Sequence, residues 1–331
     1  MPELTQSPAE VGIPTLPAVM NPTELGRHLA PYSAGLWAGK SPQELRVRAL
    51  RCHPESRCTV EINVRIDGGW RQWIGKVFAT DRLDIYQAME GIREVGFGEG
   101  EEFSIPRPLL YLRSLHLLLQ ERVPGPRAEE IFVNGDARQR ASAGERCARW
   151  LARFHRSAPR VGPVSDLKSL MVAIERWTRR IEQRGGSFGG KLARLFRQLE
   201  ERATSVVPVE LCAGHGSYSA SHVILANGRT VTFDWDGYDV ADPARDVARF
   251  IVALRRLAYG RLHSVRALDD VADVFQRTYK AEGPPQIEAN LSFHKASVCL
   301  KLAKYVLSKP VSDQHKRIEA MLDEGLRFLE Q

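Results

Sequence analysis

Residues 210–250 read ELCAGHGSYSASHVILANGRTVTFDWDGYDVADPARDVARF, and this segment holds most of the residues with evident chemistry. Its apolar runs at 223–226 and 230–234 flank an Asn-Gly pair, which predicts two short strands joined by a tight turn. The second strand is followed closely by aspartates at positions 234, 236, 239, 242 and 246. Clustered carboxylates repel one another unless hydrogen-bond donors or a hard cation compensate, and Mg²⁺ with nucleotide phosphates is a common solution.

These aspartates differ in what their neighbours predict. Asp242 precedes Pro243, and an aspartate followed by proline is a common start of a helix. For Asp246 a structural role is favoured over a catalytic one. Asp234 directly follows the apolar run of the second strand, so we expect it at a strand terminus that points into a cleft.

The composition is that of an ordinary globular chain. The 331 residues include 47 Lys or Arg and 40 Asp or Glu, which gives a net charge of +7 and a pI of about 9.3. Apolar runs end after about five residues, far short of the ~20 that a membrane-spanning helix needs. The sequence therefore argues against an integral membrane protein, a disordered chain and a disulfide scaffold.

The cysteines and the N-terminus both indicate a reducing compartment. The first residues carry acids and prolines where a signal peptide would need a basic start and an apolar stretch, so a cytoplasmic location is expected. Paired CxxC spacing is absent, which argues against a zinc site and favours reduced thiols. The cysteines are scattered singly, at positions 52, 58, 147, 212 and 299.

The excess of basic residues raises the question of nucleic-acid binding. Arginines crowd residues 179–184 and 249–257, but they alternate with apolar residues at helical spacing. That arrangement is typical of a solvated helix face, and no recognition motif accompanies the charge. The sequence therefore gives nucleic acid little support as a partner.

Patterning divides the chain into three parts: a loosely ordered segment over 1–25, an N-lobe over 26–123 and a helical C-lobe over 124–331. In the N-lobe, alternating residues predict an antiparallel strand pair, and apolar spacing then predicts a helix and a further strand, over 58–66, 70–78, 81–96 and 114–123. Pro124-Gly125 marks the boundary. In the C-lobe, helical spacing is clearest over 145–155, 169–181, 191–203 and from Asp242 onward.

Several motifs, in this order along the chain, resemble those of the aminoglycoside phosphotransferase and choline kinase-like family. IGKVF resembles its strand with the ATP-binding lysine, QERVPG its hinge and WLARFHRS its Leu-x-x-Leu/Phe-His helix. HGSYSASHVIL, FDW and DPARDVAR resemble its catalytic-loop and metal-binding motifs, which lie in segment 210–250. The resemblance implies an α+β, bilobal protein-kinase-like fold with a small antiparallel-sheet N-lobe and a larger, mainly helical C-lobe.

The resemblance also assigns roles in nucleotide binding. It implies that Lys76 grips the α and β phosphates and that Glu90, fourteen residues further on, is its ion-pair partner. Glu94 lies one helical turn from Glu90 and is the rival partner. The alternative is that Lys76 is a snorkelling edge residue. The adenine pocket would be lined, mainly through backbone groups, by Gln120, Glu121 and Val123.

Two catalytic-loop positions depart from the family pattern. Ser217 stands where the family has the aspartate that accepts the acceptor's proton, and His222 stands where it has a metal-binding asparagine. A serine cannot take that charge, and the loss of general-base help costs about 10²–10⁴ in rate. Asp234 and Asp236 would hold the metal, because alternate residues of an extended segment share a face, and Asp236 would replace part of the missing base.

The histidines in the neighbouring motifs are read as structural. In the family, the histidine at the position of His215 holds the catalytic loop and is not itself the base. His222 either ligates a divalent ion or hydrogen-bonds a neighbouring carbonyl. His155 lies on an apolar helix face, which is typical of a core histidine.

Two functions remain open from the sequence. The first is an ATP- or GTP-dependent phosphotransferase that uses Mg²⁺ and acts on a hydroxyl of a small molecule or modified peptide. The second is a pseudokinase-like protein that binds a nucleotide, peptide or protein partner without phosphoryl transfer. A cationic acceptor such as an aminoglycoside would favour an acidic groove. Carboxylates available for one stand at positions 269, 270, 273, 282 and 288.

Overall fold

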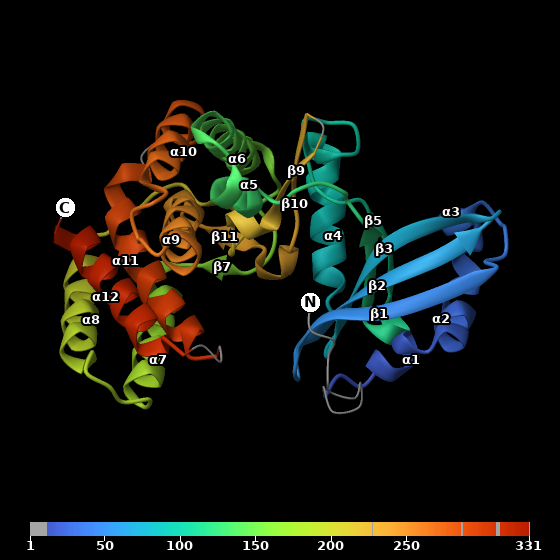
Figure 1. The fold of residues 1–331 in the computed structure, drawn as a ribbon, viewed down its shortest axis with the longest axis horizontal. Coiled ribbons are helices and arrows are strands. Elements are labelled where there is room, and N and C mark those ends of the chain that lie inside the picture. Colours follow the sequence, from blue (N-terminus) through green and yellow to red (C-terminus); the bar gives the residue numbers. More distant parts are fainter. Residues whose placement is uncertain (1–11, 227, 286, 309–311, 331) are drawn as a thin grey trace. The chain divides into compact units, whose positions relative to one another are not determined.

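The structure is a computed structural model that describes residues 12–226, 228–285, 287–308 and 312–330. The chain divides into two compact units, Met1–Pro124 and Gly125–Gln331. The first unit is built on an antiparallel sheet and the second is mainly helical, so the predicted α+β class is confirmed (Figure 1). None of the helices within the described ranges is long and apolar enough to cross a bilayer.

The first unit contains a five-stranded antiparallel sheet in the order β1-β2-β3-β6-β5. Its strands are β1 (Glu44–His53), β2 (Arg57–Ile66), β3 (Gly69–Phe78), β5 (Pro108–Leu112) and β6 (Leu117–Glu121). The remaining elements are α1 (Leu16–Met20), α2 (Pro22–Leu29), α3 (Ser33–Trp37), α4 (Leu83–Ile92) and the short β4 (Phe103–Ser104). The predicted β2–β3 hairpin, the helix and the strand before the hinge are confirmed, whereas β1 was not predicted.

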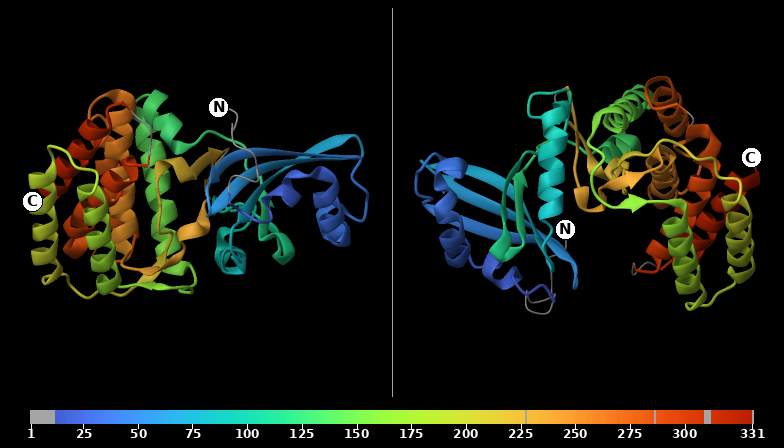
Figure 2. Two further views of the ribbon diagram at one scale, coloured as in Figure 1. Left: turned by 90° about the horizontal axis from the view of Figure 1, so that it is seen from below. Right: turned by 180° about the vertical axis from the view of Figure 1, so that it is seen from behind.

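The core of the first unit lies on one face of this sheet, where α1–α3 pack (Figure 2). Trp37 of α3 stacks on Trp73 of β3 with ring centroids 5.8 Å apart. The expectation of a loosely ordered segment over 1–25 is therefore wrong for its described part, because α1 and α2 each bury two apolar side chains in the core. Residues 1–11 lie outside the described residues. Short helices such as α1 are stabilised by packing rather than by propensity, so local pattern alone does not reveal them.

Gly75 permits the close packing of the sheet on this core. An added Cβ at this position would lie 2.8 Å from Val60 Cγ2 and 3.0 Å from Leu117 Cδ1, both in fully buried side chains. Such distances require the neighbouring core to shift. The glycine next to Lys76 is therefore explained by packing on the face opposite to the lysine.

The cysteines of β1 and β2 correct the expectation of reduced thiols throughout the chain. Cys52 and Cys58 are opposite each other in the β1–β2 register, with Cα atoms 4.0 Å apart, and they form a disulfide. Their spacing of six residues matches no metal-binding or redox motif, so only the strand register shows that they meet. The other three cysteines are free and buried.

The second unit is a helical bundle with two small sheets beside it (Figure 1). Its helices are α5 (Ala128–Asn134), α6 (Ala137–Ser157), α7 (Leu167–Glu182), α8 (Gly189–Ala203), α9 (Pro243–Leu262), α10 (Asp269–Glu282), α11 (Ile287–Val306) and α12 (Gln314–Glu330). Its strands are β7 (Val164–Ser165), β8 (Cys212–Gly214), β9 (Val223–Ala226), β10 (Arg229–Thr232) and β11 (Asp239–Ala241). The C-lobe helices and the β9–β10 pair expected from the sequence are confirmed.

The start of α9 follows the sequence prediction. The Asp242 carboxylate accepts the backbone N–H of Ala244 at 2.8 Å, and Pro243 occupies the first helical position. The same carboxylate also accepts from Asn290 Nδ2 at 2.8 Å and lies 3.1 Å from His294 Nε2, both on α11. Asp242 therefore caps α9 and ties it to α11.

Candidate active site

Lys76 lies on the face of the first unit's sheet opposite to α1–α3. Strand register places Lys76 beside Thr59 of β2 and Leu118 of β6, and side chains at paired positions share a face. The neighbouring positions, Gly75 and Val77, face the core. Lys76 is only 6% exposed, in a central strand. The alternative of a snorkelling edge residue does not fit this position.

Glu90 and Glu94 follow on the helical segment after β3. Glu90 is in the last turn of α4, and its Oε1 accepts from Arg93 Nη1 at 3.0 Å. Glu94 lies beyond the end of α4, in a π-helical turn over Arg93–Phe97. The first non-helical residues of that turn are Val95 and Gly96, so helical backbone continues through Glu94 and leaves the two carboxylates one turn apart. The pairing of Glu90 with Lys76, and Glu94 as its rival, stay predictions.

The predicted adenine-binding residues follow along β6. Gln120 pairs with Ile74 of β3, faces the same side of the sheet as Lys76 and is 5% exposed. Glu121 ends the strand, and its backbone N–H donates to Arg107 O at 2.8 Å. Val123 lies beyond the strand and is half-buried. The backbone groups of 121–123 carry the proposed contact to the base, which these observations leave as a prediction.

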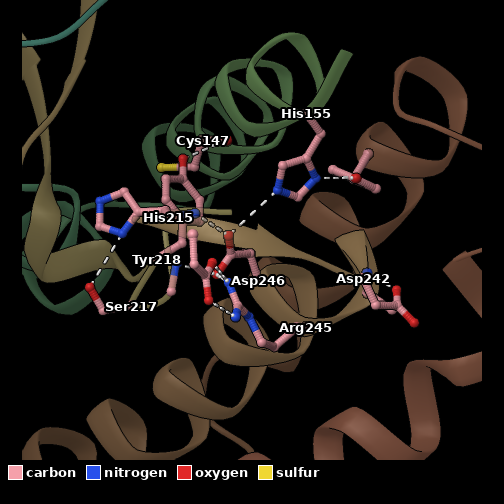
Figure 3. Close-up of polar contacts among 12 residues, drawn as sticks. Cys147, His155, His215, Ser217, Tyr218, Asp242, Arg245 and Asp246 are labelled. Atoms are coloured by element: carbon pink, nitrogen blue, oxygen red, sulfur yellow. Dashed lines mark hydrogen bonds and ion pairs between the residues drawn. The ribbon is translucent and has the colours of Figure 1, made fainter. Parts of the chain in front are cut away.

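In the second unit, the loop predicted to be catalytic is held by Asp246 (Figure 3). The carboxylate of Asp246 accepts the backbone N–H of His215 at 2.6 Å and that of Gly216 at 3.0 Å. Asp246 is 1% exposed and projects from the first turn of α9. A carboxylate that accepts two backbone N–H groups holds the loop in one conformation. This is the structural role favoured by the sequence.

Charges around Asp246 keep it ionised. Burial alone would raise the pKa of its carboxyl group, but the Arg245 guanidinium and the His155 imidazole hold that pKa well below its usual range. His155 Nε2 lies 3.5 Å from Asp246 Oδ2, and His155 Nδ1 lies 2.6 Å from the Tyr279 hydroxyl. Arg245 forms a bidentate pair with Asp239 at 2.5 and 2.6 Å. His155 is therefore a core histidine, as expected, and also a counter-charge to the loop anchor.

Ser217 and His215 form a hydrogen-bonded pair whose direction can be assigned. His215 Nε2 lies 3.1 Å from the Phe233 carbonyl oxygen, which can only accept, so Nε2 carries the proton in the neutral ring. Nδ1 is then the acceptor, and the Ser217 hydroxyl donates to it at 3.3 Å. The loop thus places a serine hydroxyl against the acceptor nitrogen of an imidazole.

His222 and Asp234 face each other in the same way. His222 Nδ1 lies 3.1 Å from the Ser217 carbonyl oxygen, so Nδ1 donates, and Nε2 lies 3.3 Å from Asp234 Oδ2. When the imidazole is neutral, Nε2 and Oδ2 are both acceptors. Two facing acceptors need a proton or a cation between them. Both of the alternatives open for His222 from the sequence are therefore compatible with its contacts.

The backbone around Asp234 differs from the sequence expectation. Asp234 has φ 74° and ψ 65°, which is left-handed, and Trp235–Gly237 form a 3₁₀ turn rather than an extended segment. The argument that placed Asp236 on the same face as Asp234 by strand alternation is therefore wrong, and that argument was the basis for its predicted role. A left-handed non-glycine residue at this position is a local strain of the kind concentrated at functional sites.

A metal ion would find two of its ligands in this region. Within the described ranges, no group of three or more His, Cys, Asp or Glu side chains is arranged to hold a metal. The Asp234–His222 pair nevertheless fits a cation that takes its other ligands from phosphates and water, as Mg²⁺ commonly does. Oxygen is the preferred ligand of Mg²⁺, so Asp234 is the better donor of the two.

Sequence reasoning missed the role of Arg245. It neutralises Asp239 and lies 3.9 Å from Asp246, and an added Cβ on Gly214 would meet its guanidinium. The signal was present in the motif DPARDVAR, where an arginine precedes the second aspartate. The motif alone does not predict the contact of Arg245 with Asp239, because that contact depends on the pairing of β11 with β8.

The chain is similar to known proteins in family and in fold. The sequence profile described as "Phosphotransferase enzyme family" matches residues 64–289. None of the curated proteins matches the sequence.

Solved structures share the fold at low sequence identity. A choline/ethanolamine kinase family protein from Mesorhizobium loti is 14% identical over 93% of this chain and 95% of its own, with a TM-score of 0.61. A thermostable mutant of an aminoglycoside phosphotransferase, in a ternary complex with ADP and hygromycin B, is 15% identical over 91% and 98%, with a TM-score of 0.61. A glucosamine kinase is 14% identical over 94% and 88%, with a TM-score of 0.63. The expected protein-kinase-like fold is confirmed by these matches.

Proposed function

Because this chain belongs to the phosphotransferase enzyme family, we propose that it transfers the γ-phosphoryl group of ATP to a hydroxyl group of a small molecule. The observation that carries the proposal is the fixed loop in which Ser217 donates to His215 while His222 faces Asp234. A loop held by a buried carboxylate is preorganised, and phosphoryl transfer depends chiefly on positioning and electrostatics.

Each residue has a distinct task in this proposal. Lys76 binds the α and β phosphates, Glu90 orients Lys76, and the backbone of 120–123 binds the adenine. The acceptor oxygen forms the new P–O bond, the bond from the γ-phosphorus to the bridging oxygen breaks, and ADP leaves. The acceptor's proton passes to Ser217 Oγ while the Ser217 proton passes to His215 Nδ1. Asp246 then stabilises the imidazolium through the field that already couples the two groups.

The ion that accompanies the nucleotide would be held by Asp234, with His222 and Asp236 as further candidates. Mg²⁺ bound there supplies charge neutralisation on the phosphates. Neighbouring structures bind nucleotides, including one amicoumacin kinase in complex with AMP-PNP and Ca²⁺. GTP in place of ATP, a peptide hydroxyl as acceptor and a cytoplasmic location, where nucleoside triphosphates are available, remain part of the proposal.

The second candidate is a binding protein without phosphoryl transfer. It is favoured by one observation, the serine at the position where the family has a carboxylate base. The Ser217–His215 pair supports the phosphotransferase instead, because the Ser217 hydroxyl has an acceptor for its proton within hydrogen-bond distance. Nucleotide binding is common to both candidates, so turnover separates them.

ATP with Mg²⁺ is expected to raise the melting temperature of the wild-type chain by several degrees. A ligand at 100 times its Kd stabilises the native state by about 2.7 kcal/mol. Lys76→Met and Asp234→Asn should each remove most of this shift, because each deletes a charge proposed to hold phosphates or the cation. Differential scanning fluorimetry over a Mg²⁺ titration measures the effect.

Lys40→Met is the matched control for Lys76→Met. Lys40 lies in the same unit, has a side chain 53% exposed and pairs with the exposed Asp67. Its substitution removes the same charge and should leave the nucleotide shift intact. A nucleotide shift of wild-type size in both Lys76→Met and Asp234→Asn would contradict the assigned roles.

A further inference from the structure

A set of basic side chains gathers between α7, α9 and α11 of the second unit. On α9, Arg245, Arg249 and Arg256 recur at intervals of four and seven residues and so share one face. These three arginines and the basic side chains near them on α7 and α11 are called the basic cluster. Its members are Arg176, Arg180, Arg245, Arg249, Arg256, Lys301 and Lys304.

Arg249 is the half-buried centre of this cluster. Its Nε and Nη1 atoms are inaccessible to solvent and have no hydrogen-bond partner in the part of the chain that the structure describes. Burial and the nearby Arg256 lower the pKa of Arg249 to about 10. A buried guanidinium with unmet donors is costly, because each donor has lost its water without gaining an acceptor.

Lys301 and Lys304 extend the cluster toward solvent along α11. Burial, and then Arg249 and Arg245, lower the pKa of Lys301 to about 8, and its Nζ lies 5.8 Å from the Trp177 ring centroid. Burial, followed by Arg180 and Arg176, lowers the pKa of Lys304. Both lysines are half-buried, whereas both arginines on α7 are exposed. The cluster thus runs from half-buried side chains on α9 and α11 to exposed arginines on α7.

The carboxylates that face the cluster are already engaged. Asp239 is the bidentate partner of Arg245, and Asp246 accepts two backbone N–H groups and faces His155. These are the two carboxylates that raise the pKa of Lys301, so they are the ones near enough to act on it. The two carboxylates nearest Lys301 are therefore already paired, which leaves a net positive field around Arg249 and Lys301.

The cluster also adjoins the catalytic loop. Arg249 follows Asp246 by three residues, which is about one turn of α9, and Asp246 holds the His215 and Gly216 amides. An anion bound to this cluster would be within the same unit as Ser217 and close to the loop anchor. The second unit therefore contains both the proposed proton acceptor, the Ser217–His215 pair, and a positively charged cluster that could bind an anion.

Most of the carboxylates that would suit a cationic acceptor already form ion pairs with basic side chains outside the cluster. Asp269 Oδ1 lies 2.7 Å from Arg255 Nη1, Glu282 pairs with Arg149 at 2.9 Å, and Glu288 pairs with Lys280. The sequence offered five carboxylates for an acidic groove that would bind an aminoglycoside. Three of these five are therefore already paired with basic side chains.

We propose that the basic cluster binds an oxyanion group of the acceptor, so that the substrate is a hydroxyl compound that also carries a phosphate, sulfate or carboxylate. The claim that the bound anion belongs to the phosphoryl acceptor rests on the proposed phosphotransferase function. The anion site itself does not depend on that function. Arg249 donates to the anion, Lys301 supplies a second charge, and Trp177 packs beside the lysine. Both basic side chains are half-buried.

The first test uses inorganic sulfate as the probe and thermal unfolding as the readout. Wild type, Lys301→Met and Lys168→Met are compared in sulfate and in chloride at equal ionic strength. Lys168 is the matched control, because it is an exposed lysine at the start of α7 and its substitution removes the same charge. Sulfate also stabilises proteins non-specifically by exclusion, but that effect is linear, does not saturate and is common to all three chains.

Wild type and Lys168→Met should show a saturable rise in Tm with sulfate, and Lys301→Met should lose the saturable part. In chloride, Lys301→Met should melt above wild type, because it removes one of several mutually repelling buried charges. Arg249→Gln is the second variant and should also lose the saturable response. An equal response in all four chains, meaning an adventitious ion only, overturns the anion site.

The second test identifies the acceptor class by ATP-dependent turnover of matched compounds: glucose, glucosamine and glucose 6-phosphate. The phosphorylated compound should have the lowest KM, and Lys301→Met should raise that KM by about 10- to 100-fold with little change in kcat. Preference for glucosamine, or an equal KM change in Lys168→Met, overturns the anionic acceptor.

The two tests also separate failure of this inference from failure of the proposed function. A nucleotide shift and turnover without a saturable sulfate response overturn the anion site and leave the phosphotransferase function standing. A saturable sulfate response that depends on Lys301, without turnover of any of the three compounds, supports the anion site and counts against the acceptor role.

Discussion

Asp246→Asn is expected to lower the free energy of unfolding by about 3–5 kcal/mol, the usual cost of removing one partner from a buried charge network. Asparagine keeps the shape of the side chain but offers one oxygen where Asp246 uses two for the His215 and Gly216 amides. It also leaves His155 and Arg245 without the charge that faces them. Urea unfolding at pH 5.5 measures the loss.

The loss should depend on pH in a defined direction. The pKa of Asp246 is held well below its usual range, so its contribution is present above about pH 4 and is lost as pH falls toward its folded pKa. Burial alone would lower the pKa of His155, but Cys212, Tyr279 and Asp246 hold it well above its ordinary value. The His155 contribution is therefore full below about pH 6.5 and declines as pH rises.

The difference between wild type and Asp246→Asn should consequently be largest between about pH 4 and 6.5 and smaller on either side. Asp270→Asn, an exposed substitution in the first turn of α10, is the control and should cost less than about 1 kcal/mol at every pH. A difference that stays constant from pH 3.5 to 7 would show that Asp246 acts through shape rather than charge.

Ser217→Asp should increase phosphoryl transfer by up to ~10²-fold at saturating Mg²⁺. The substitution places a carboxylate where the serine hydroxyl now donates to His215 Nδ1, so the acceptor's proton gains a direct base. Initial rates of ADP release, measured with and without acceptor, report the change.

Ser217→Asn is the matched control, because it has the size of aspartate without the charge, and it should not exceed the wild-type rate. Ser217→Ala should fall below wild type, since it removes the relay to His215. Equal rates for Asp and Asn at this position would rule out the base as the limiting element. No turnover in any form, with nucleotide bound in all of them, would establish the non-catalytic candidate.

The strand and helix patterns that were predictable from the sequence are those with local signals. The β2–β3 hairpin has alternating side chains on both sides of a glycine turn, and α9 begins at an Asp-Pro pair. β1 was missed although Leu45, Val47 and Ala49 alternate with polar residues. Its outward face consists largely of arginines, and such a run of charged residues does not by itself indicate a strand.

The candidate site was predictable as a set of residues and not as a set of contacts. The family motifs located Ser217, His222 and Asp234, but the donor and acceptor roles of the two histidines depend on carbonyl oxygens that the loop conformation supplies. The Asp246 clamp joins residues thirty positions apart. Such a contact exists only after α9 packs beneath the loop, so no local pattern contains it.

The helices that cover the first unit's sheet set the order in which this unit can form during synthesis. The Thr15 hydroxyl donates to the Leu115 carbonyl at 2.7 Å across one hundred residues, and α1–α3 share their core with Leu117 and Leu119 of β6. Contacts so distant in sequence must wait for loop closure. On the ribosome, α1–α3 emerge before β6, so the apolar side chains that they share with its core stay exposed to solvent until β6 has emerged.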